Sequence, residues 1–485
     1  MKKKLIENSL IYSGLQILQG GIGFLLLPIY TRFLSPDDYG VVSVINSVAV
    51  FLGIFYMLGL DGAAYRYYFD LRDRQDELKR FWGTIITLLF VLSSVLTLVF
   101  LCFGGFLLRP FIGGIKFYPN MLLGIIGAAV LPLFTVYQSL IQAQHNGKKY
   151  GIVRLSNVAI LSLLTILFVV FFRLRATGPI LATTLTAVLF FTFALWKMRG
   201  KFIFGINTKY LKKIFSYSLP IVPHKLTGWA VSLLDRILIN RFVSTAAVGI
   251  YNIGYLFGSI QGAISYAVND AFAPWFYEEM KENRTVKVKK FFILAMTLYI
   301  TLSLWITFFA KEFLWIVAKG DFRESWRVVG LLSFGSFFSG YYCFLVNQLF
   351  YTEKGTRYVP VATISAALIG FLLNLVLIRR YGIMGAAITM FFTNVVTTFL
   401  VGLFAQRLQP VDWDHLFIFK LLLVNGTACI FSYYISSVVI TPFSAVLIIK
   451  ILVVLVCTFV NLFFCWRKVG GLDILKESLI LIRPS

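Results

Sequence analysis

Two basic side chains lie within one strongly apolar segment of the chain, at about residues 215–240. At 3.6 residues per turn, the spacing of Lys225 and Arg236 places both on one helix face, with Trp229 and Ser232 between them. A charged group facing lipid costs about 2.5–3.5 kcal/mol on insertion scales, so we expect this face to line a water-filled cavity. Ammonium and guanidinium groups there would bind an anion, above all a phosphate. The first hypothesis is therefore a phosphate-binding cavity.

Two prolines precede these cations. Pro220 and Pro223 should break the helix near its cytoplasmic end, and irregular backbone at membrane depth is tolerated only beside a cavity. An alternative remains for each cation. Arg236 could pair with Asp235 or with an interfacial phosphate, and Lys225 could extend along the helix to the interface.

Polar side chains in other apolar segments predict a polar interior. A helix is predicted at 246–276. Along it, steps of seven, seven and four residues separate Asn252, Ser259, Tyr266 and Asp270, which places them close to one helix face. Such residues are also used as contacts between helices. The candidate substrate contacts are Lys225, Arg236, Trp229, Gln16, Gln19, Asn252 and Tyr266, and further polar residues of the segments are Asn46, Gln138, Gln142, Asn347 and Gln348.

Two aspartates are candidates for ion coupling or for gating. Asp61 and Asp270 lie near the ends of the second and eighth segments, about 209 residues apart. The structural alternative, which we prefer, is a salt bridge at a helix end to a loop cation such as Arg66. Lys450 lies inside the last apolar segment and has no predicted partner.

The composition places most of the chain in a membrane. Of its 485 residues, 59% are hydrophobic and only 14% are charged, whereas soluble proteins have about 25% charged residues. About fourteen stretches are long and apolar enough to span a bilayer. They lie at about residues 10–34, 40–64, 82–103, 120–144, 152–172, 177–196, 215–240, 246–276, 291–310, 328–351, 358–378, 382–406, 417–437 and 443–466. The longest predicted outer loop is 311–327.

The net charge of +24 agrees with this topology. With the N-terminus inside, most Lys and Arg residues fall in the cytoplasmic loops, as the positive-inside rule requires. Both termini are then cytoplasmic. In a membrane protein the basic excess indicates contact with anionic lipid rather than with nucleic acid.

The chain also repeats itself. Arg32-Phe33-Leu34-Ser35 and Arg241-Phe242-Val243-Ser244 each end an apolar run, and each is followed by a run that starts at glycine, Gly40 or Gly249. The near-constant offset predicts that helices 1–6 recur as helices 7–12, with the halves related by a pseudo-two-fold axis along the membrane normal. The expected parts are an N-lobe (1–200), a C-lobe (201–410) and two extra helices with a cytoplasmic tail (411–485).

Signals for an enzyme or a metal site are weak. The three histidines lie far apart in the sequence, and the five cysteines fall singly within apolar runs. Asp412-Trp413-Asp414 is similar to the Asp-x-Asp of sugar transferases, but it is predicted to be a solvated turn in a short loop. The chain has no glycine-rich phosphate loop. We therefore expect a protein that is not an enzyme, with no metal and no cofactor apart from a coupling Na⁺ or H⁺.

Two regions resemble a known family. Leu27-Pro28-Ile29-Tyr30-Thr31-Arg32-Phe33-Leu34-Ser35-Pro36-Asp37-Asp38-Tyr39-Gly40 resembles the first helix hairpin of the polysaccharide-transporter branch of the multidrug/oligosaccharidyl-lipid/polysaccharide (MOP) exporter superfamily. Ser218-Leu219-Pro220, Leu234-Asp235-Arg236-Ile237-Leu238 and Val248-Gly249-Ile250-Tyr251 are similar to that branch's seventh and eighth helices.

The resemblance implies a Wzx-type flippase. Such a protein turns undecaprenyl-pyrophosphate-linked oligosaccharide repeats, for O-antigen, capsule or a similar polysaccharide, across the bacterial inner membrane by alternating access. It implies lipid-linked oligosaccharide, membrane lipids, a glycan polymerase and other assembly proteins as partners. Lipid II flippases carry charge on the cavity face of their first helix, but the counterpart of Lys225 here is the neutral Gln16, which favours another glycan. The rival functions are a drug or metabolite exporter of the same superfamily and a polytopic glycan polymerase or ligase.

Overall fold

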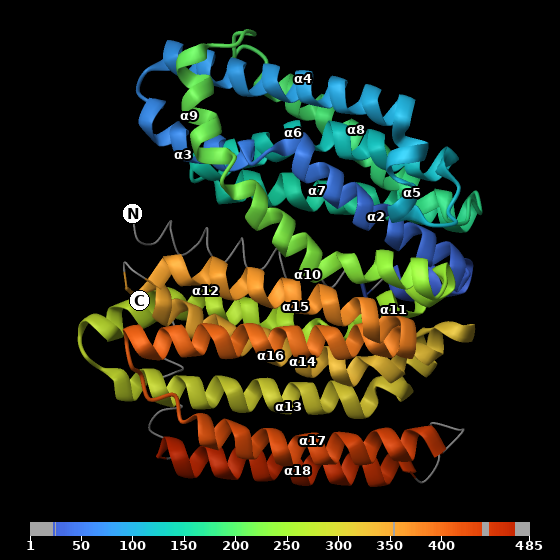
Figure 1. Ribbon diagram of the computed structural model, residues 1–485, viewed down its shortest axis with the longest axis vertical. Helices are drawn as coiled ribbons and strands as arrows, with labels where there is room; N and C mark the ends of the chain where they lie inside the picture. Colours follow the sequence, from blue (N-terminus) through green and yellow to red (C-terminus); the bar gives the residue numbers. More distant parts are fainter. Residues whose placement is uncertain (1–22, 25, 353–354, 439–445, 471–485) are drawn as a thin grey trace. The chain divides into compact units, whose positions relative to one another are not determined.

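The molecule is all-α, as the apolar periodicity predicts. The computed structural model describes residues 23–24, 26–352, 355–438 and 446–470. Every regular element within these ranges is a helix (Figure 1). Eleven of the described helical segments are long and apolar enough to cross a membrane. The prediction of a multi-pass membrane protein is therefore confirmed.

Three of the predicted spans are not among these eleven. Most of the first, 10–34, lies outside the described residues, as do Gln16 and Gln19. The spans at 215–240 and 246–276 are helical, but polar residues interrupt their apolar character: the first carries Lys225 and Arg236, and the second carries Asn252, Gln261 and Asp270. Composition alone therefore places these two helices apart from the simple apolar spans.

The chain divides into two compact units. Unit 1 covers Met1–Asn252 and unit 2 covers Ile253–Ser485. The expected division at 1–200, 201–410 and 411–485 stays a prediction. The helices that end in unit 1 are α2 (Pro36–Met57), α3 (Leu60–Leu71), α4 (Gln75–Leu107), α5 (Arg109–Ile112), α6 (Leu122–Ala143), α7 (Gly147–Ile166), α8 (Thr177–Met198), α9 (Thr208–Ser218) and α10 (Ile221–Phe242). Helix α11 (Thr245–Gly258) crosses the boundary.

The described part of unit 2 contains the remaining helices. They are α12 (Ile260–Lys281), α13 (Thr285–Val317), α14 (Trp326–Phe350), α15 (Tyr358–Tyr381), α16 (Ile383–Leu408), α17 (His415–Val438) and α18 (Val446–Val469). Short π-helical or 3₁₀ turns lie at Phe117–Met121, Leu167–Phe171, Gly320–Ser325 and Gly355–Arg357.

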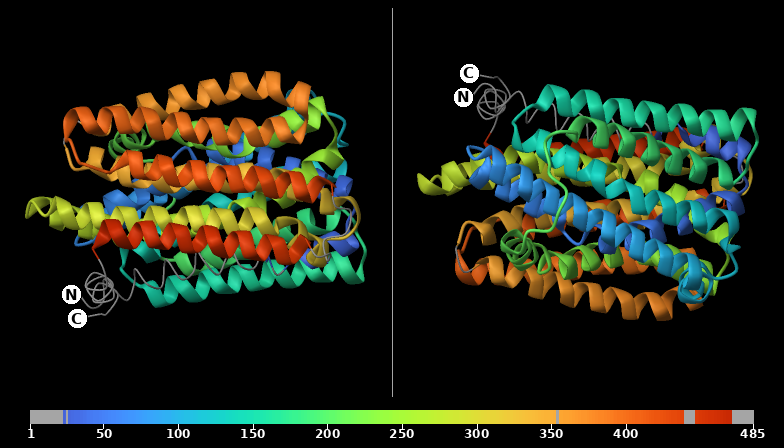
Figure 2. Two further views of the ribbon diagram at one scale, coloured as in Figure 1. Left: turned by 90° about the horizontal axis from the view of Figure 1, so that it is seen from below. Right: turned by 90° about the horizontal axis from the view of Figure 1, so that it is seen from above.

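Each unit has a central helix. In unit 1, α6 packs against α2, α3, α4 and α8, and Figure 2 shows α7 running beside α8. The fully buried Trp82, Phe134 and Tyr137 fill the core of this unit. In unit 2, α14 packs against α12, α13 and α16, and α13 also packs against α17 and α18. Because each helix has an apolar face turned to its neighbours, packing rather than sequence-local signals sets these contacts.

The repeated Gly40 and Gly249 meet each other's helices. A Cβ on Gly40 would lie 1.8 Å from the carbonyl oxygen of Thr245, and a Cβ on Gly249 would lie 2.1 Å from that of Pro36. The N-terminal ends of α2 and α11 therefore cross with their backbones in direct contact. Small residues permit such an approach between membrane helices. The sequence echo thus marks a helix crossing within unit 1.

This crossing predicts a large effect of a single methyl group. Gly40→Ala should lower the thermal unfolding temperature of the purified protein, because the backbones of α2 and α11 would have to separate. Gly105→Ala in α4 is the matched control, since a Cβ there meets nothing within 4 Å. Equal unfolding temperatures for the two variants would contradict the close crossing.

Two breaks in unit 1 position charged residues. The predicted span 40–64 is interrupted at Leu58 and Gly59, whose φ angles are 45° and 73°, so Asp61 lies in the first turn of a new helix, α3. A Cβ on Gly59 would also lie 2.7 Å from the carbonyl oxygen of Ser218, so glycine is favoured there for two reasons. The break predicted at Pro220 is confirmed, because α9 ends at Ser218 and α10 begins after Pro220, whereas Pro223 lies in the first turn of α10 and does not interrupt it.

Two expectations were wrong in unit 2 or at its boundary. The predicted helix at 246–276 is interrupted at Ser259, between α11 and α12, so its polar stripe is not continuous. The predicted outer loop 311–327 is shorter, because α13 continues to Val317. Apolar Phe313, Leu314 and Trp315 extend the helix beyond the ionisable Lys311 and Glu312.

The predicted solvated turn at Asp412–Asp414 was also wrong at its centre. Trp413 is fully buried, and its indole N–H donates to Oε1 of Gln348 at 2.7 Å. The two aspartates pair with lysines, Asp412 with Lys289 and Asp414 with Lys468. The hydrogen bond from Lys289 lowers the pKa of the Asp412 carboxyl. This segment therefore anchors the start of α17 rather than forming a free loop.

Candidate functional site

Lys225 forms an ion pair with Asp61 inside unit 1. The Nζ atom of Lys225 donates to both carboxylate oxygens of Asp61, at 2.8 and 3.0 Å. Lys225 lies in the second turn of α10 and Asp61 in the first turn of α3, where the helix dipole also favours a carboxylate. Their side chains stay 32% and 27% exposed. The sequence interpretation that paired Asp61 with Arg66 was wrong, because Arg66 pairs with Asp70 in the next turn of α3.

This ion pair lines a cavity of about 360 Å³. The walls come from α2, α3, α6, α7, α8 and α10, all within unit 1. Small residues on α2 and α6, among them Ala49, Gly53, Gly124 and Gly127, leave the space open. The cavity is mostly apolar, so an uncompensated charge in it would be costly. Because Lys225 and Asp61 carry opposite charges, the pair adds no net charge to the cavity.

Amides and hydroxyls make up the rest of the polar lining. Asn46 of α2, predicted to be part of a polar interior, is exposed on this cavity. The other polar lining residues are Thr135, Asn157, Thr183, Thr184 and Thr186. The sequence analysis missed Asn157 and the threonines of α8. The sequence did contain two signals: an amide within an apolar segment, and the cluster Thr183-Thr184-x-Thr186. The threonines do not stand out, because each hydroxyl bonds to its own helix backbone and is therefore tolerated in lipid.

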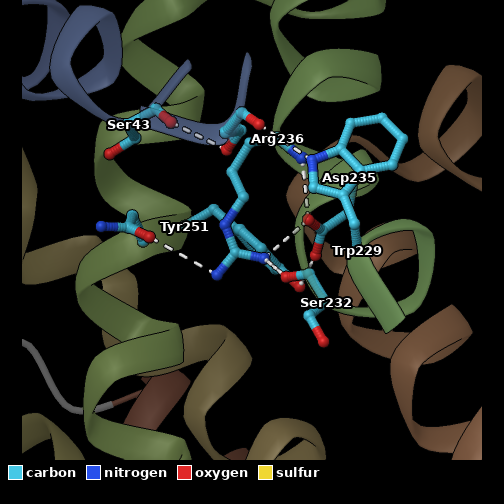
Figure 3. Close-up of polar contacts among 8 residues, drawn as sticks. Ser43, Trp229, Ser232, Asp235, Arg236 and Tyr251 are labelled. Carbon is cyan, nitrogen blue, oxygen red and sulfur yellow. Dashed lines mark hydrogen bonds and ion pairs between the residues drawn. The ribbon is translucent and has the colours of Figure 1, made fainter. Parts of the chain in front are cut away.

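Arg236 belongs to a buried network. Its guanidinium pairs with Asp235 at 2.7 Å and also donates to the Ser232 carbonyl (Figure 3). Asp235 in turn accepts the hydroxyl of Tyr251 at 2.6 Å, and the arginine is only 2% exposed. The open alternative for Arg236, pairing with Asp235, is therefore the arrangement seen. The predicted cationic face is divided: Lys225 lines the cavity and Arg236 ties α10 to α11.

Two other predicted site residues join helices in unit 1. The indole N–H of Trp229 donates to the Ser47 carbonyl at 2.8 Å, and its ring lies 4.7 Å from that of Phe51. Asn252 contacts Arg236 at 3.5 Å and donates to the Tyr39 hydroxyl at 3.3 Å. Both residues are thus used between helices, the alternative function of such polar residues. A role for them in substrate binding stays a prediction.

Two further site candidates lie in unit 2. Tyr266 and Asp270 are both exposed on α12. Their substrate and coupling roles stay predictions. Lys450, for which the sequence offered no partner, is buried and pairs with Glu312 of α13 at 2.7 Å. The sequence analysis had placed Glu312 in a loop and therefore missed this pair.

Comparisons with known proteins identify related chains. A family model described as "Polysaccharide biosynthesis protein" matches residues 5–280. An uncharacterized membrane protein of Haemophilus influenzae is 25% identical over 388 residues, which cover 75% of this chain and 88% of the relative. The Lsg locus putative protein 1 of the same organism is 24% identical over 360 residues, covering 72% of this chain and 86% of the relative. An uncharacterized membrane protein of Methanocaldococcus jannaschii is 21% identical and covers 79% of this chain and 94% of its own.

Solved structures share the fold at low identity. The lipid II flippase MurJ, in an inward closed conformation, has a TM-score of 0.65 at 14% identity and covers 92% of this chain and 99% of that chain. An inward-facing multidrug resistance MATE family transporter of the MOP superfamily has a TM-score of 0.58 at 14% identity, with 82% and 94% covered. These similarities confirm the predicted helical transporter fold.

Proposed function

Because the chain belongs to the polysaccharide biosynthesis protein family, we propose that it is a flippase for undecaprenyl-pyrophosphate-linked oligosaccharide repeat units. The repeats would be those of O-antigen, capsule or a similar surface polysaccharide. The protein would act in the bacterial inner membrane, with both termini in the cytoplasm. Flippases and drug exporters share this fold, so it is the family match, and not the fold, that favours a flippase over a drug exporter.

The observation that carries the proposal is the Lys225–Asp61 pair on the cavity of unit 1. A phosphate that enters the cavity would compete with Asp61 for the ammonium group of Lys225. Charge-assisted hydrogen bonds to phosphate are among the strong polar contacts in a site of low polarity. Lys225 is therefore the residue that would recognise the lipid's pyrophosphate.

The neutral polar lining suits the sugars. The amides of Asn46 and Asn157 each offer donors and an acceptor to hydroxyl groups, and the threonine hydroxyls of α8 add further partners. The cavity of about 360 Å³ would take the phosphates and the first sugars. The polyprenyl tail, being apolar, would stay in lipid, so only the head group would need a polar path.

Alternating access would move the head group without exposing it to hydrocarbon. The transport step forms and breaks no covalent bond, so no enzymatic group is required. Direction would come from a Na⁺ or H⁺ gradient, with Asp61 and Asp270 as the coupling or gating candidates, or from consumption of the product outside by a glycan polymerase and other assembly proteins. Lipid-linked oligosaccharide and membrane lipids are thus the proposed partners.

The test is the intermediate that accumulates when the protein is deleted. A strain that lacks it should retain single lipid-linked repeats that are inaccessible to an enzyme or label added outside the inner membrane. The wild-type chain should restore external accessibility. Repeats that reach the outer face unpolymerised in the deletion strain would point to a polymerase instead, and unchanged glycan with altered drug resistance would point to an exporter.

A further inference from the structure

The end of unit 1 at which α6 ends, α7 begins and α8 ends carries a cluster of lysines. Lys149 lies in the first turn of α7, Lys197 in the last turn of α8 and Lys201 in the segment that follows α8. Within the ranges that the structure covers, none of these three lysines forms an ion pair with a carboxylate. Among the described residues of unit 1, no carboxylate within ion-pair distance therefore balances their shared charge.

Two of the ammonium groups lie over a pair of packed aromatic rings, of which one is buried and the other partly buried. The Nζ of Lys149 lies 5.8 Å from the ring centroid of Tyr137, and the Nζ of Lys197 lies 5.9 Å from that of Phe193. The rings of Tyr137 and Phe193 pack edge to face at 5.8 Å. Lys201 follows the end of α8, where its backbone N–H donates to the Met198 carbonyl at 2.9 Å, and burial and then the charges of Lys149 and Lys197 lower the pKa of its ammonium group.

A polar atom beside the cluster also has no partner. The hydroxyl of Tyr137 is buried and makes no hydrogen bond with any described residue, although the rest of the side chain is fully packed. A buried hydroxyl without a partner is costly, and in native proteins such groups usually have one. An anion held by the lysines could supply an acceptor for it.

The surroundings match the head-group layer of a membrane. Trp196 is 63% exposed, and the Nζ of Lys197 lies 3.9 Å from its ring. Ile203 and Phe204, on the segment that begins at Lys201, are also exposed. Tryptophan is enriched at the membrane–water interface, and exposed apolar side chains next to lysines suit a bilayer surface.

We propose that Lys149, Lys197 and Lys201, with the Tyr137 hydroxyl, bind the phosphate of a membrane lipid. The site is distinct from the cavity of Lys225, so it does not depend on the proposed function. The positive-inside pattern predicts that this end faces the cytoplasmic leaflet, where anionic lipids are concentrated. The phosphate could belong to a resident phospholipid or to a polyprenyl pyrophosphate that gathers there.

The test compares two triple variants of the full-length protein. Lys149→Gln, Lys197→Gln and Lys201→Gln remove the cluster, whereas Lys209→Gln, Lys212→Gln and Lys213→Gln remove the same charge from α9. Native mass spectrometry of the purified protein would measure retention of phosphatidylglycerol, phosphatidylcholine and undecaprenyl pyrophosphate. The cluster variant should lose about tenfold or more of the preference for a phosphate-bearing anionic lipid, while the α9 variant keeps it.

Measuring the two anionic lipids separately distinguishes the two sources of phosphate. Loss of phosphatidylglycerol alone assigns the site to a resident phospholipid, and loss of undecaprenyl pyrophosphate alone assigns it to the polyprenyl lipid. Equal losses in both triple variants, or no loss in either, would overturn the proposal. Should the cluster variant fail to fold, Tyr137→Phe decides, because it removes one hydroxyl and no charge; we expect it to weaken retention about fivefold, and unchanged retention would overturn the proposal.

Discussion

Replacing Lys225 by glutamine should strongly reduce export of the glycan while the protein still folds and inserts. Lys225 is the cation on the cavity of unit 1, and its side chain is exposed to that cavity. A hydrogen bond to a charged group contributes about 1.5–3 kcal/mol, so its loss should lower transport by about tenfold to a hundredfold. External labelling of lipid-linked repeats in cells that carry the variant measures the effect, and immunoblotting of membranes measures its amount.

Variants of the partner separate a phosphate grip from a structural ion pair. Asp61→Asn frees the ammonium group of Lys225, so export should persist if the cation serves to bind phosphate. If Asp61→Asn instead lowers export as much as Lys225→Gln does, the ion pair itself or ionisation of Asp61 is required. Lys225→Arg, which keeps the charge, is the conservative control. Full export by Lys225→Gln would refute the role of this residue.

Arg236 should behave differently from Lys225, although the sequence places them on one helix face. Arg236 is buried with Asp235, and Tyr251 completes the network. Its removal leaves an uncompensated carboxylate and should reduce the amount of folded protein rather than the transport step alone. The face of α10 therefore combines a cavity cation with a structural one.

Helical periodicity and apolar length predicted the class of the protein and most of its helices, because lipid requires every backbone group to be paired within a helix. The same signals could not find the interruption at Ser259 or the longer α13. The residues at each of these places are compatible with more than one backbone conformation, and contacts with neighbouring helices determine which conformation is adopted. The break between α2 and α3 was not predicted either, because Leu58 adopts a positive φ, which is uncommon for leucine.

The partners of charged residues were the least predictable part. The sequence favoured a salt bridge from Asp61 to a loop cation such as Arg66, yet Asp61 pairs with Lys225, which is far away in the chain. Such pairs depend on which helix faces meet, and one sequence without its fold does not contain that information. The echo of Gly40 and Gly249 was more informative, because a glycine repeated at one offset indicates a place where only hydrogen fits.

Lys450 offers the sharpest test of a charge that serves the fold. Its ammonium group is 2.7 Å from a carboxylate oxygen of Glu312 and also donates to the Phe308 carbonyl at 3.3 Å, and its side chain is 2% exposed. Lys450→Met leaves the Glu312 carboxylate buried without its cation. Removal of one partner of a buried pair costs about 3–5 kcal/mol, so we expect a clear fall in the thermal unfolding temperature of the purified protein.

The double variant distinguishes the pair from simple loss of a side chain. Replacing both residues, as in Lys450→Met with Glu312→Leu, removes the buried charges together and should restore most of the stability. Lys468→Met is the matched control, because Lys468 is half exposed where it pairs with Asp414, so its loss should cost much less than that of the buried Lys450. If the double variant is as unstable as the single one, the pair is not the cause. If the double variant recovers its stability, this intramembrane lysine serves to join α18 to α13 and not to bind substrate.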